Sequence, residues 1–176
     1  MEIVIESLLD GARRATGSVA IIDVFRAFTT AAVALANGAS HITMVSTVEE
    51  ALALRNSGIG QVCMGEVQGR APAGFDFGNS PFEVAKIDFR GRAIIQRTGA
   101  GTQGIVSANQ ADRLYAASLV TAHPTAKALL LETPHRITLV AMGNTRSFER
   151  TRMSCALCTY ATFWRGDTAM SMPCVS

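Results

Sequence analysis

Short apolar runs that are typical of β-strands alternate with helix-like segments along most of this sequence. The strand-like runs are residues 2–8, 18–24, 41–46, 61–66, 92–97, 114–120 and 136–143, and the helix-like segments are residues 29–38, 47–56, 80–87, 101–110 and 124–132. Strands that are joined through helices run parallel, in a sheet that the helices cover on both faces. The sequence therefore predicts an α/β fold, namely a three-layer α/β/α sandwich around a largely parallel sheet. A mixed sheet is the alternative.

Local signals support several of these boundaries. Asn37 and Gly38 stand where a helix should end, because glycine readily adopts the left-handed conformation that terminates one. Thr47 and Glu50 have the spacing of a capping box, and Pro81 stands at the favoured first position of a short helix. A faint repeat at an offset of 72 residues leaves an internal duplication open; it pairs Ile22, Thr30, Ala36 and Asn37 with Ile94, Thr102, Ala108 and Asn109.

Composition narrows the class of protein. The chain has 176 residues, a length that fits one compact domain, and with 48% hydrophobic residues it is not intrinsically disordered. The formal net charge of +2 is too small to indicate nucleic acid or a membrane surface as a partner. No apolar run approaches the roughly 20 residues of a membrane span. The N-terminus is acidic where a signal peptide is basic, so we expect a cytoplasmic protein.

The cysteines give only a weak signal. Cys155 and Cys158 have redox or metal-site spacing, but no second pair or nearby histidine accompanies them. We expect them, with Cys63 and Cys174, to be small apolar residues in a reducing compartment.

Polar residues collect after the ends of three predicted strands. Asp23 and Arg26 follow the second strand, Glu66 follows the fourth, and Arg97 ends the fifth, directly before a glycine-rich turn. In an open α/β sheet, ligands bind beyond the carboxyl ends of the strands, so these side chains should share one pocket. Arginine suits phosphate, sulfonate and carboxylate groups, and helix N-termini favour anions.

The two carboxylates suit a magnesium ion. Mg²⁺ is commonly bound through one or two carboxylates together with waters and substrate phosphate oxygens, so Asp23 and Glu66 are candidate ligands. A metal ion and the two arginines, Arg26 and Arg97, around one anion would offset the negative charge that develops during phosphoryl transfer. Asp23 is alternatively a nucleophile. Taken singly, each residue also has a structural alternative. That alternative is a helix cap for Asp23, a surface charge for Arg26 and Arg97, and an ion pair with Arg70 for Glu66.

The segment 99–104 matches GxGxxG, the fingerprint of a dinucleotide-binding turn. That fingerprint normally has an acidic residue about 20 positions later, which holds the ribose. Here the next strand ends at Val120, and the first later acidic residue is Glu132. A dinucleotide-binding oxidoreductase is therefore kept as a weaker alternative.

Several stretches together resemble the 2-phosphosulfolactate phosphatase family. Residues 19–39, VAIIDVFRAFTTAAVALANGA, resemble its "VIDVLRATTT…ALANGA" signature, and residues 65–81 resemble its segment ending in "GFD.GNSP". Residues 94–105 resemble its strand and T-x-x-G-T loop, and residues 140–144 its late strand. The resemblance implies a Mg²⁺-dependent hydrolase that converts 2-phospho-3-sulfolactate, or a similar small anionic phosphate monoester, to 3-sulfolactate and phosphate, on a route to coenzyme M.

The resemblance, together with the position of Arg97 at a strand end, gives the predicted site residues, and their roles are our hypothesis. Asp23 and Glu66 are the predicted catalytic and metal-binding residues. The predicted substrate-binding residues are Arg26, Thr29, Thr30, Asn79, Ser80, Arg97, Thr98, Gly101 and Thr102. Among them, Asn79 and Ser80 are expected to close the site.

The C-terminal tail departs from the family pattern. We assign residues 1–150 to the phosphatase-like domain and residues 151–176 to an atypical, truncated or altered tail of that domain, since Arg152, Met153 and Ser154 stand where the family has acidic residues. A catalytically impaired homologue that only binds an anionic metabolite is therefore the main alternative. A shortened domain would expose apolar surface, so we expect a homo-oligomer, most simply a dimer.

Overall fold

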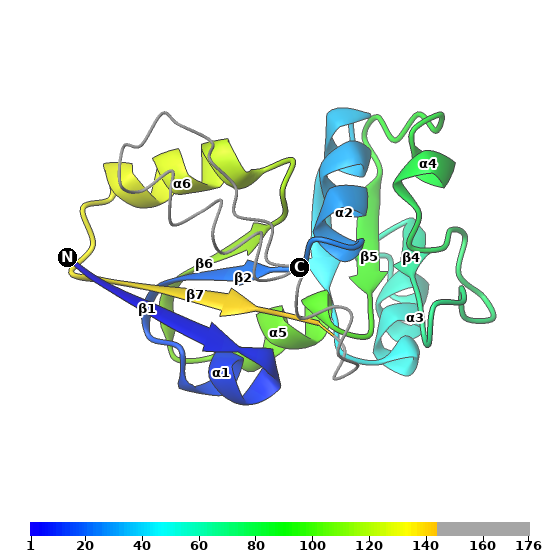
Figure 1. Ribbon diagram of the computed structural model, residues 1–176. Helices are drawn as coiled ribbons and strands as arrows, with labels where there is room; N and C mark the ends of the chain where they lie inside the picture. The colour runs from blue at the N-terminus through cyan, green and yellow to red at the C-terminus, as the bar shows by residue number, and fades with distance from the viewer. Residues whose placement is uncertain (144–176) are drawn as a thin grey trace, which may run out of the picture.

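The computed structural model describes residues 1–143 and has the alternating order of strands and helices (Figure 1). The elements are β1 (Glu2–Ser7), α1 (Leu8–Arg14), β2 (Gly17–Ile22), α2 (Ala27–Ala36), β3 (His41–Met44), α3 (Val48–Asn56), β4 (Val62–Gly65), α4 (Pro81–Val84), β5 (Ala93–Arg97), α5 (Gly101–Ser107), β6 (Ala111–Ala117), α6 (Ala122–Leu131) and β7 (Arg136–Ala141). The predicted tail 151–176, with Cys155, Cys158 and Cys174, lies outside the described residues.

The described strands form two sheets, and every strand pairing in them is parallel. The four-stranded sheet has the order β1-β7-β2-β6, and the three-stranded sheet has the order β3-β5-β4. The predicted α/β class and its parallel strands are confirmed; the division into two sheets was not foreseen. The faint repeat pairs Ile22 of β2 with Ile94 of β5, and these two strands belong to different sheets. The internal duplication stays a prediction.

Helices cover both faces of the four-stranded sheet. In Figure 1, α6 lies on one side of this sheet and α1 and α5 lie on the other. The buried core includes Ala12 of α1, Ile21 of β2, Leu129 of α6 and Leu139 of β7. These apolar side chains come from elements far apart in the sequence, so their burial holds the layers together.

The three-stranded sheet is also covered on both faces. Val84 of α4 packs with Met64 of β4 and Ile94 of β5, while Ala51 of α3 packs with Cys63 and Ile95 on the opposite face. Successive strand residues point to opposite faces, which explains why neighbours in β4 and β5 enter different cores.

Helix α2 joins the two halves. Ala27 and Phe28, in its first turn, belong to the core of the four-stranded sheet, whereas Ala34 packs in the core of the three-stranded sheet. Figure 1 shows α2 standing between the sheets. The segment that follows β2 is therefore fixed at the boundary of both halves.

The predicted boundary signals are largely present. The Thr47 hydroxyl accepts a hydrogen bond from the Glu50 N–H at 3.0 Å, and Pro81 is the first residue of α4. Gly38 has φ +94°, as expected for a glycine after a helix. Helix α2 begins at Ala27, two residues before the predicted start at Thr29.

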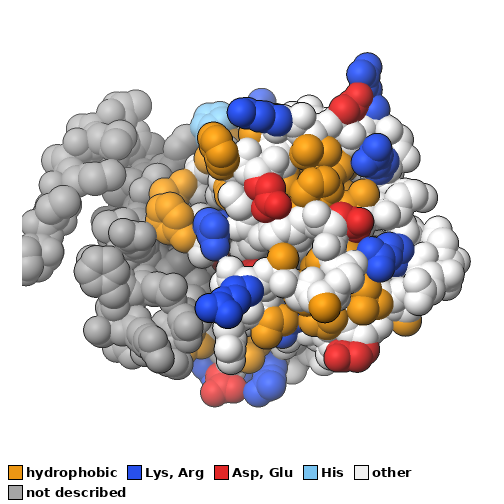
Figure 2. Space-filling model, turned by 90° about the vertical axis from the view of Figure 1, so that its right-hand side faces the viewer, with side chains coloured by type: hydrophobic (Ala, Val, Ile, Leu, Met, Phe, Trp, Pro, Cys, Tyr) orange, Lys and Arg blue, Asp and Glu red, His pale blue; other side chains and the backbone are white. Residues whose placement is uncertain are grey.

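Charges of both signs are mixed on the surface over the α3 and α4 side. Figure 2 shows basic and acidic side chains interspersed with apolar ones on the described part of this face. Within residues 1–143, no helix combines the length and apolarity needed to cross a membrane.

Candidate active site

Two carboxylates flank the glycine-rich loop between β5 and α5. The Gly99 N–H donates a hydrogen bond to Glu66 Oε1 at 2.6 Å. A Cβ placed on Gly101 would lie 2.8 Å from Asp23 Oδ2, so that carboxylate approaches the other end of the loop. Asp23 follows β2 and Glu66 follows β4, so the carboxyl ends of strands from both sheets meet at this loop.

The Glu66 carboxylate is oriented by backbone groups. Its second oxygen, Oε2, accepts a hydrogen bond from the Gly69 N–H at 2.6 Å. Because each carboxylate oxygen has two lone pairs, both oxygens keep acceptor capacity after these bonds. Glu66 is therefore held in one orientation while still able to contact a ligand.

Asp23 is nearly buried, with 6% of its surface exposed. Its N–H donates to the Ala117 carbonyl at 2.9 Å, which ties the end of β2 to the end of β6. A Cβ on Gly101 would also lie 2.8 Å from the Ala27 Cβ. Gly101 is thus the residue that lets the loop and the carboxylate approach this closely.

Thr98 and Thr102 form reciprocal hydrogen bonds that stabilise the glycine-rich loop. The Thr98 N–H donates to Thr102 Oγ1 at 2.8 Å, and the Thr102 N–H donates to Thr98 Oγ1 at 3.1 Å. Both residues are buried. These contacts show how the pair shapes the loop; a direct substrate contact for either hydroxyl stays a prediction.

Arg97 stabilises the same region through hydrogen bonds to two backbone carbonyls. Its Nη1 donates to the Glu66 carbonyl at 2.7 Å, and its Nε donates to the Ser46 carbonyl at 3.2 Å. The guanidinium thus fixes the start of the segment that carries the Glu66 carboxylate. A guanidinium has five N–H donors, so further donors remain for an anion.

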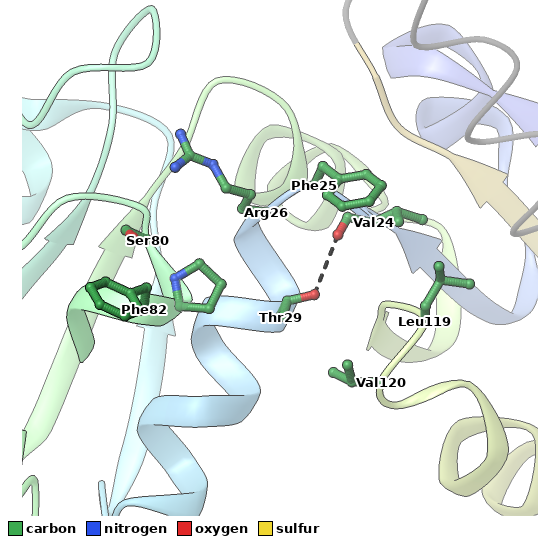
Figure 3. A pocket seen from close by; sticks show the side chains of 9 residues that line it. Val24, Phe25, Arg26, Thr29, Ser80, Phe82, Leu119 and Val120 are labelled. Carbon is green, nitrogen blue, oxygen red and sulfur yellow. Dashed lines mark hydrogen bonds between the residues drawn. The ribbon is translucent and has the colours of Figure 1, made fainter. Parts of the chain in front are cut away.

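Arg26, three residues after Asp23 in the chain, is exposed. Within the described part of the chain, its guanidinium makes no hydrogen bond or ion pair. It lines an open pocket of about 480 Å³ together with Val24, Phe25, Thr29, Ser80, Pro81, Phe82, Leu119 and Val120 (Figure 3). Of the predicted substrate-binding residues, Arg26, Thr29 and Ser80 thus share one pocket.

The hydroxyls near Arg26 make local hydrogen bonds. Thr29 Oγ1 donates to the Val24 carbonyl at 3.3 Å, and Thr30 Oγ1 donates to the Arg26 carbonyl at 2.9 Å. Thr29 is half-buried and lines the pocket, whereas Thr30 is fully buried in α2. Thr29 is therefore the better placed of the two to meet a ligand.

The GNSP segment borders the pocket. Ser80 caps α4, since its hydroxyl accepts a hydrogen bond from the Glu83 N–H at 3.4 Å. Asn79 is buried, and its Oδ1 has no hydrogen-bond partner among the described residues. Asn79 is not among the residues that line the pocket, so its predicted contact with a substrate stays a prediction.

Two kinds of residue escaped the sequence analysis. Leu119 and Val120, which the sequence analysis assigns to the predicted strand 114–120, line the pocket from the loop after β6. Gln96 is completely buried, and its Nε2 donates to the Ala27 carbonyl at 3.0 Å, which links β5 to the start of α2. The rule that ligands bind beyond the carboxyl ends of strands, applied to apolar as well as polar residues, predicts Leu119 and Val120.

The magnesium site expected at Asp23 and Glu66 stays a prediction, and the chemistry of the two carboxylates can be compared with what the ion needs. The described residues contain no group of three or more His, Cys, Asp or Glu side chains that could surround a metal. Asp23 and Glu66 contact the same loop and offer hard carboxylate oxygens. Mg²⁺ usually keeps several waters and binds through one or two carboxylates plus substrate phosphate oxygens, a requirement that this pair can meet.

The dinucleotide alternative gains no support from this geometry. A pyrophosphate seated on the loop 99–104 would meet the carboxylates of Asp23 and Glu66, and like charges repel.

Comparison with known proteins identifies similar sequences. The sequence model of the family described as 2-phosphosulpholactate phosphatase matches residues 4–171, which include part of the segment 151–176. A protein of Thermotoga petrophila named "Probable 2-phosphosulfolactate phosphatase" is 38% identical over 128 residues, covering 73% of this chain and 54% of that protein. A protein of the same name from Deinococcus radiodurans is 38% identical over 124 residues, covering 70% of this chain and 52% of that protein. The chain thus spans about half the length of the curated relatives it matches.

Proposed function

The chain belongs to the 2-phosphosulpholactate phosphatase family, and on that premise we propose that it is a phosphatase. Its proposed substrate is 2-phospho-3-sulfolactate or a similar small anionic phosphate monoester, and its products are the corresponding alcohol, 3-sulfolactate, and inorganic phosphate. The observation that carries the proposal is the meeting of Asp23 and Glu66 at one glycine-rich loop. The names of the similar proteins support the same substrate.

Each residue has a proposed role. Arg26 binds an anionic oxygen of the substrate, since its guanidinium has no partner among the described residues. Arg97 holds the Glu66 segment through the Glu66 carbonyl. Asp23 acts on the reacting group either as the general base for an attacking water or as the nucleophile.

We propose Mg²⁺ as the cofactor, held by Asp23 and Glu66. When bound there, the ion would neutralise charge on the phosphate oxygens. The two backbone N–H groups of Gly69 and Gly99 hold the Glu66 carboxylate in one orientation at the loop. We further propose a cytoplasmic homodimer whose product feeds coenzyme M formation.

A second candidate is binding of the same kind of metabolite without turnover. The observation that favours it is that each Glu66 oxygen already accepts one backbone N–H, which leaves fewer lone pairs for a metal than a carboxylate without partners has. Under this reading, Glu66 shapes the loop and the site retains only its anion-binding groups.

One assay separates the candidates. Phosphate release from 2-phospho-3-sulfolactate is measured with Mg²⁺, with excess chelator, and with the D23N variant. The phosphatase proposal expects release that requires Mg²⁺ and Asp23. Saturable binding of the substrate without release would favour the second candidate, and tight binding of NAD or NADP would revive the dinucleotide alternative.

A further inference from the structure

Gln96 is a completely buried amide on an otherwise apolar face of the three-stranded sheet. It shares this face with its neighbour in β5, Ile94, and with its register partner in β4, Met64. Its Nε2 donates to the Ala27 carbonyl at 3.0 Å, whereas its Oε1 has no hydrogen-bond partner among the described residues. A buried acceptor without a partner costs stability, so an apolar side chain of the same shape would suit this core at least as well.

Helix α2 does not need the bond from Gln96. Ala27 is the first residue of α2, and a carbonyl at that position of an α-helix accepts the N–H four residues later. A carbonyl oxygen has a second lone pair, which the Gln96 amide uses. Ala27 belongs to the core of the four-stranded sheet, so this additional bond joins one half of the molecule to the other.

Both ends of this link lead directly to the candidate site. In β5 the next residue is Arg97, whose Nη1 donates to the Glu66 carbonyl at 2.7 Å. At the other end, a Cβ on Gly101 would lie 2.8 Å from the Ala27 Cβ and 2.8 Å from Asp23 Oδ2. The link therefore fixes the segment that carries Glu66 relative to the start of α2, where the glycine-rich loop approaches Asp23.

We propose that Gln96 is a positioning residue, which sets the spacing between the Asp23 and Glu66 carboxylates by tying β5 to α2. The inference rests on the proposed phosphatase function, because it assigns a role within that same site. Since Gln96 is completely buried, it acts through Ala27 and Arg97 and not on the substrate. Loss of the link shifts the two halves of the site relative to each other and leaves each half folded.

The variant Gln96→Met keeps the shape of the side chain and removes both amide groups. We expect kcat for phosphate release to fall roughly tenfold to a hundredfold, because a misplacement of about 1 Å costs up to about a hundredfold. The midpoint of urea denaturation should stay unchanged or rise, because a buried acceptor without a partner has been removed. A purely structural amide would give the opposite pattern, a lower midpoint with an unchanged kcat.

Hydrogen exchange reports on the link without turnover. The Gly99 N–H in the glycine-rich loop is bonded to Glu66 Oε1, and this bond slows its exchange. In Gln96→Met, the peptide that covers residues 97–104 should exchange severalfold faster than in the wild type, because the loop is no longer held at a fixed distance from α2. The peptide that covers residues 2–7, at the far edge of the four-stranded sheet, should exchange as before.

Gln61→Met is the matched control. Gln61 is exposed, and its Oε1 accepts a hydrogen bond from the Ala93 N–H at 2.7 Å. Ala93 begins β5, so this bond lies at the end of the strand away from the glycine-rich loop. The control should lower the urea midpoint, because the Ala93 N–H loses this partner, and should leave kcat and the exchange of residues 97–104 unchanged.

The results separate this inference from the proposed function. An unchanged kcat, unchanged loop exchange or a lower midpoint in Gln96→Met, or equal changes in Gln61→Met, would overturn the inference. Failure of both Gln96→Met and Gln96→Leu to fold would also overturn it, since the amide would then support the fold itself. If the wild type releases no phosphate from 2-phospho-3-sulfolactate, the phosphatase proposal fails. Faster loop exchange at an unchanged midpoint then still supports the link, and unchanged exchange refutes it.

Discussion

Gly99 and Glu66, 33 residues apart in the chain, are joined by a 2.6 Å hydrogen bond from the Gly99 N–H to a carboxylate oxygen. The other oxygen of Glu66 is bonded to the Gly69 N–H at the same distance. One side chain thus connects the segment after β4 to the glycine-rich loop after β5. Bonds between a backbone N–H and a carboxylate are charge-assisted, which makes Glu66 a strong restraint on the loop.

Replacing Glu66 by Gln should loosen this loop. The amide of Gln keeps one acceptor oxygen, so either Gly69 or Gly99 loses its partner. We expect a loss of about 1–3 kcal/mol in the free energy of unfolding, the usual range for a hydrogen bond to a charged group. Urea denaturation measures it. The control is Glu49→Gln, at an exposed position of α3, and an equal loss in both variants would contradict a special role for Glu66.

Gly101→Ala should disturb the approach of the loop to α2 and Asp23. The new Cβ would lie 2.8 Å from both the Ala27 Cβ and Asp23 Oδ2. Overpacking of this kind costs about 1–3 kcal/mol of stability, and the displaced carboxylate should lower phosphate release further. Thermal unfolding and the phosphate assay report the two effects.

The matched control is Gly78→Ala. A Cβ there meets only the end of the flexible Glu83 side chain at 3.2 Å and the Ala71 Cβ at 3.9 Å. This variant should unfold and turn over like the wild type. If the two glycine variants behaved alike, the tight packing at Gly101 would not matter for the site.

Part of the fold could be predicted from local patterns. Alternating apolar runs predicted β1, β2 and the later strands because period and composition are local properties. Helix α1 was missed, since it has only seven residues and contains Gly11, a weak helix former. The division into two sheets was missed because strand pairing depends on long-range packing, which no single segment encodes.

The candidate site shows the same limit. The rule that ligand sites lie beyond parallel strand ends correctly brought Asp23 and Glu66 to one loop. It could not predict that Arg97 would bond to the Ser46 carbonyl, because such partners depend on the backbone path of distant loops. Residue types and strand ends therefore predicted which segments meet, but not which hydrogen bonds each side chain makes; the roles of these residues in a site stay predictions.

Asp23→Asn should abolish phosphate release with little effect on folding. Asn has nearly the same size, and the backbone bond to Ala117 is kept. Loss of a base or nucleophile should lower kcat by roughly a hundredfold or more. The same protein sample is checked by thermal unfolding. Undiminished turnover would remove Asp23 from the mechanism, while an unfolded variant would show a structural role instead.

Thr102→Val should destabilise the loop through an unpaired backbone group. The Thr98 N–H is buried and donates to Thr102 Oγ1 at 2.8 Å, a bond that Val cannot accept. Leaving a buried donor unsatisfied costs about 1–3 kcal/mol. Urea denaturation of Thr102→Val is compared with Thr43→Val, a half-buried β3 position at which the described structure has no hydroxyl hydrogen bond. Equal stability of the two variants would contradict the loop-closing role.

Cys63 should resist alkylation in the native protein. Its side chain is completely buried in the core beside α3, and burial raises the pKa of its thiol above the ordinary value. The thiolate is the reactive form, so at pH 7 to 8, below the ordinary thiol pKa of about 8.5, little of it forms in the folded state. Because the folded-state pKa is the raised one, this thiol supports folding at low pH, and its contribution is lost as the pH rises through that value. The modified fraction of the peptide containing Cys63, measured by mass spectrometry after treatment with N-ethylmaleimide, should be small in buffer and near complete in urea. Rapid modification in buffer alone would show that the face of the three-stranded sheet under α3 is open to solvent.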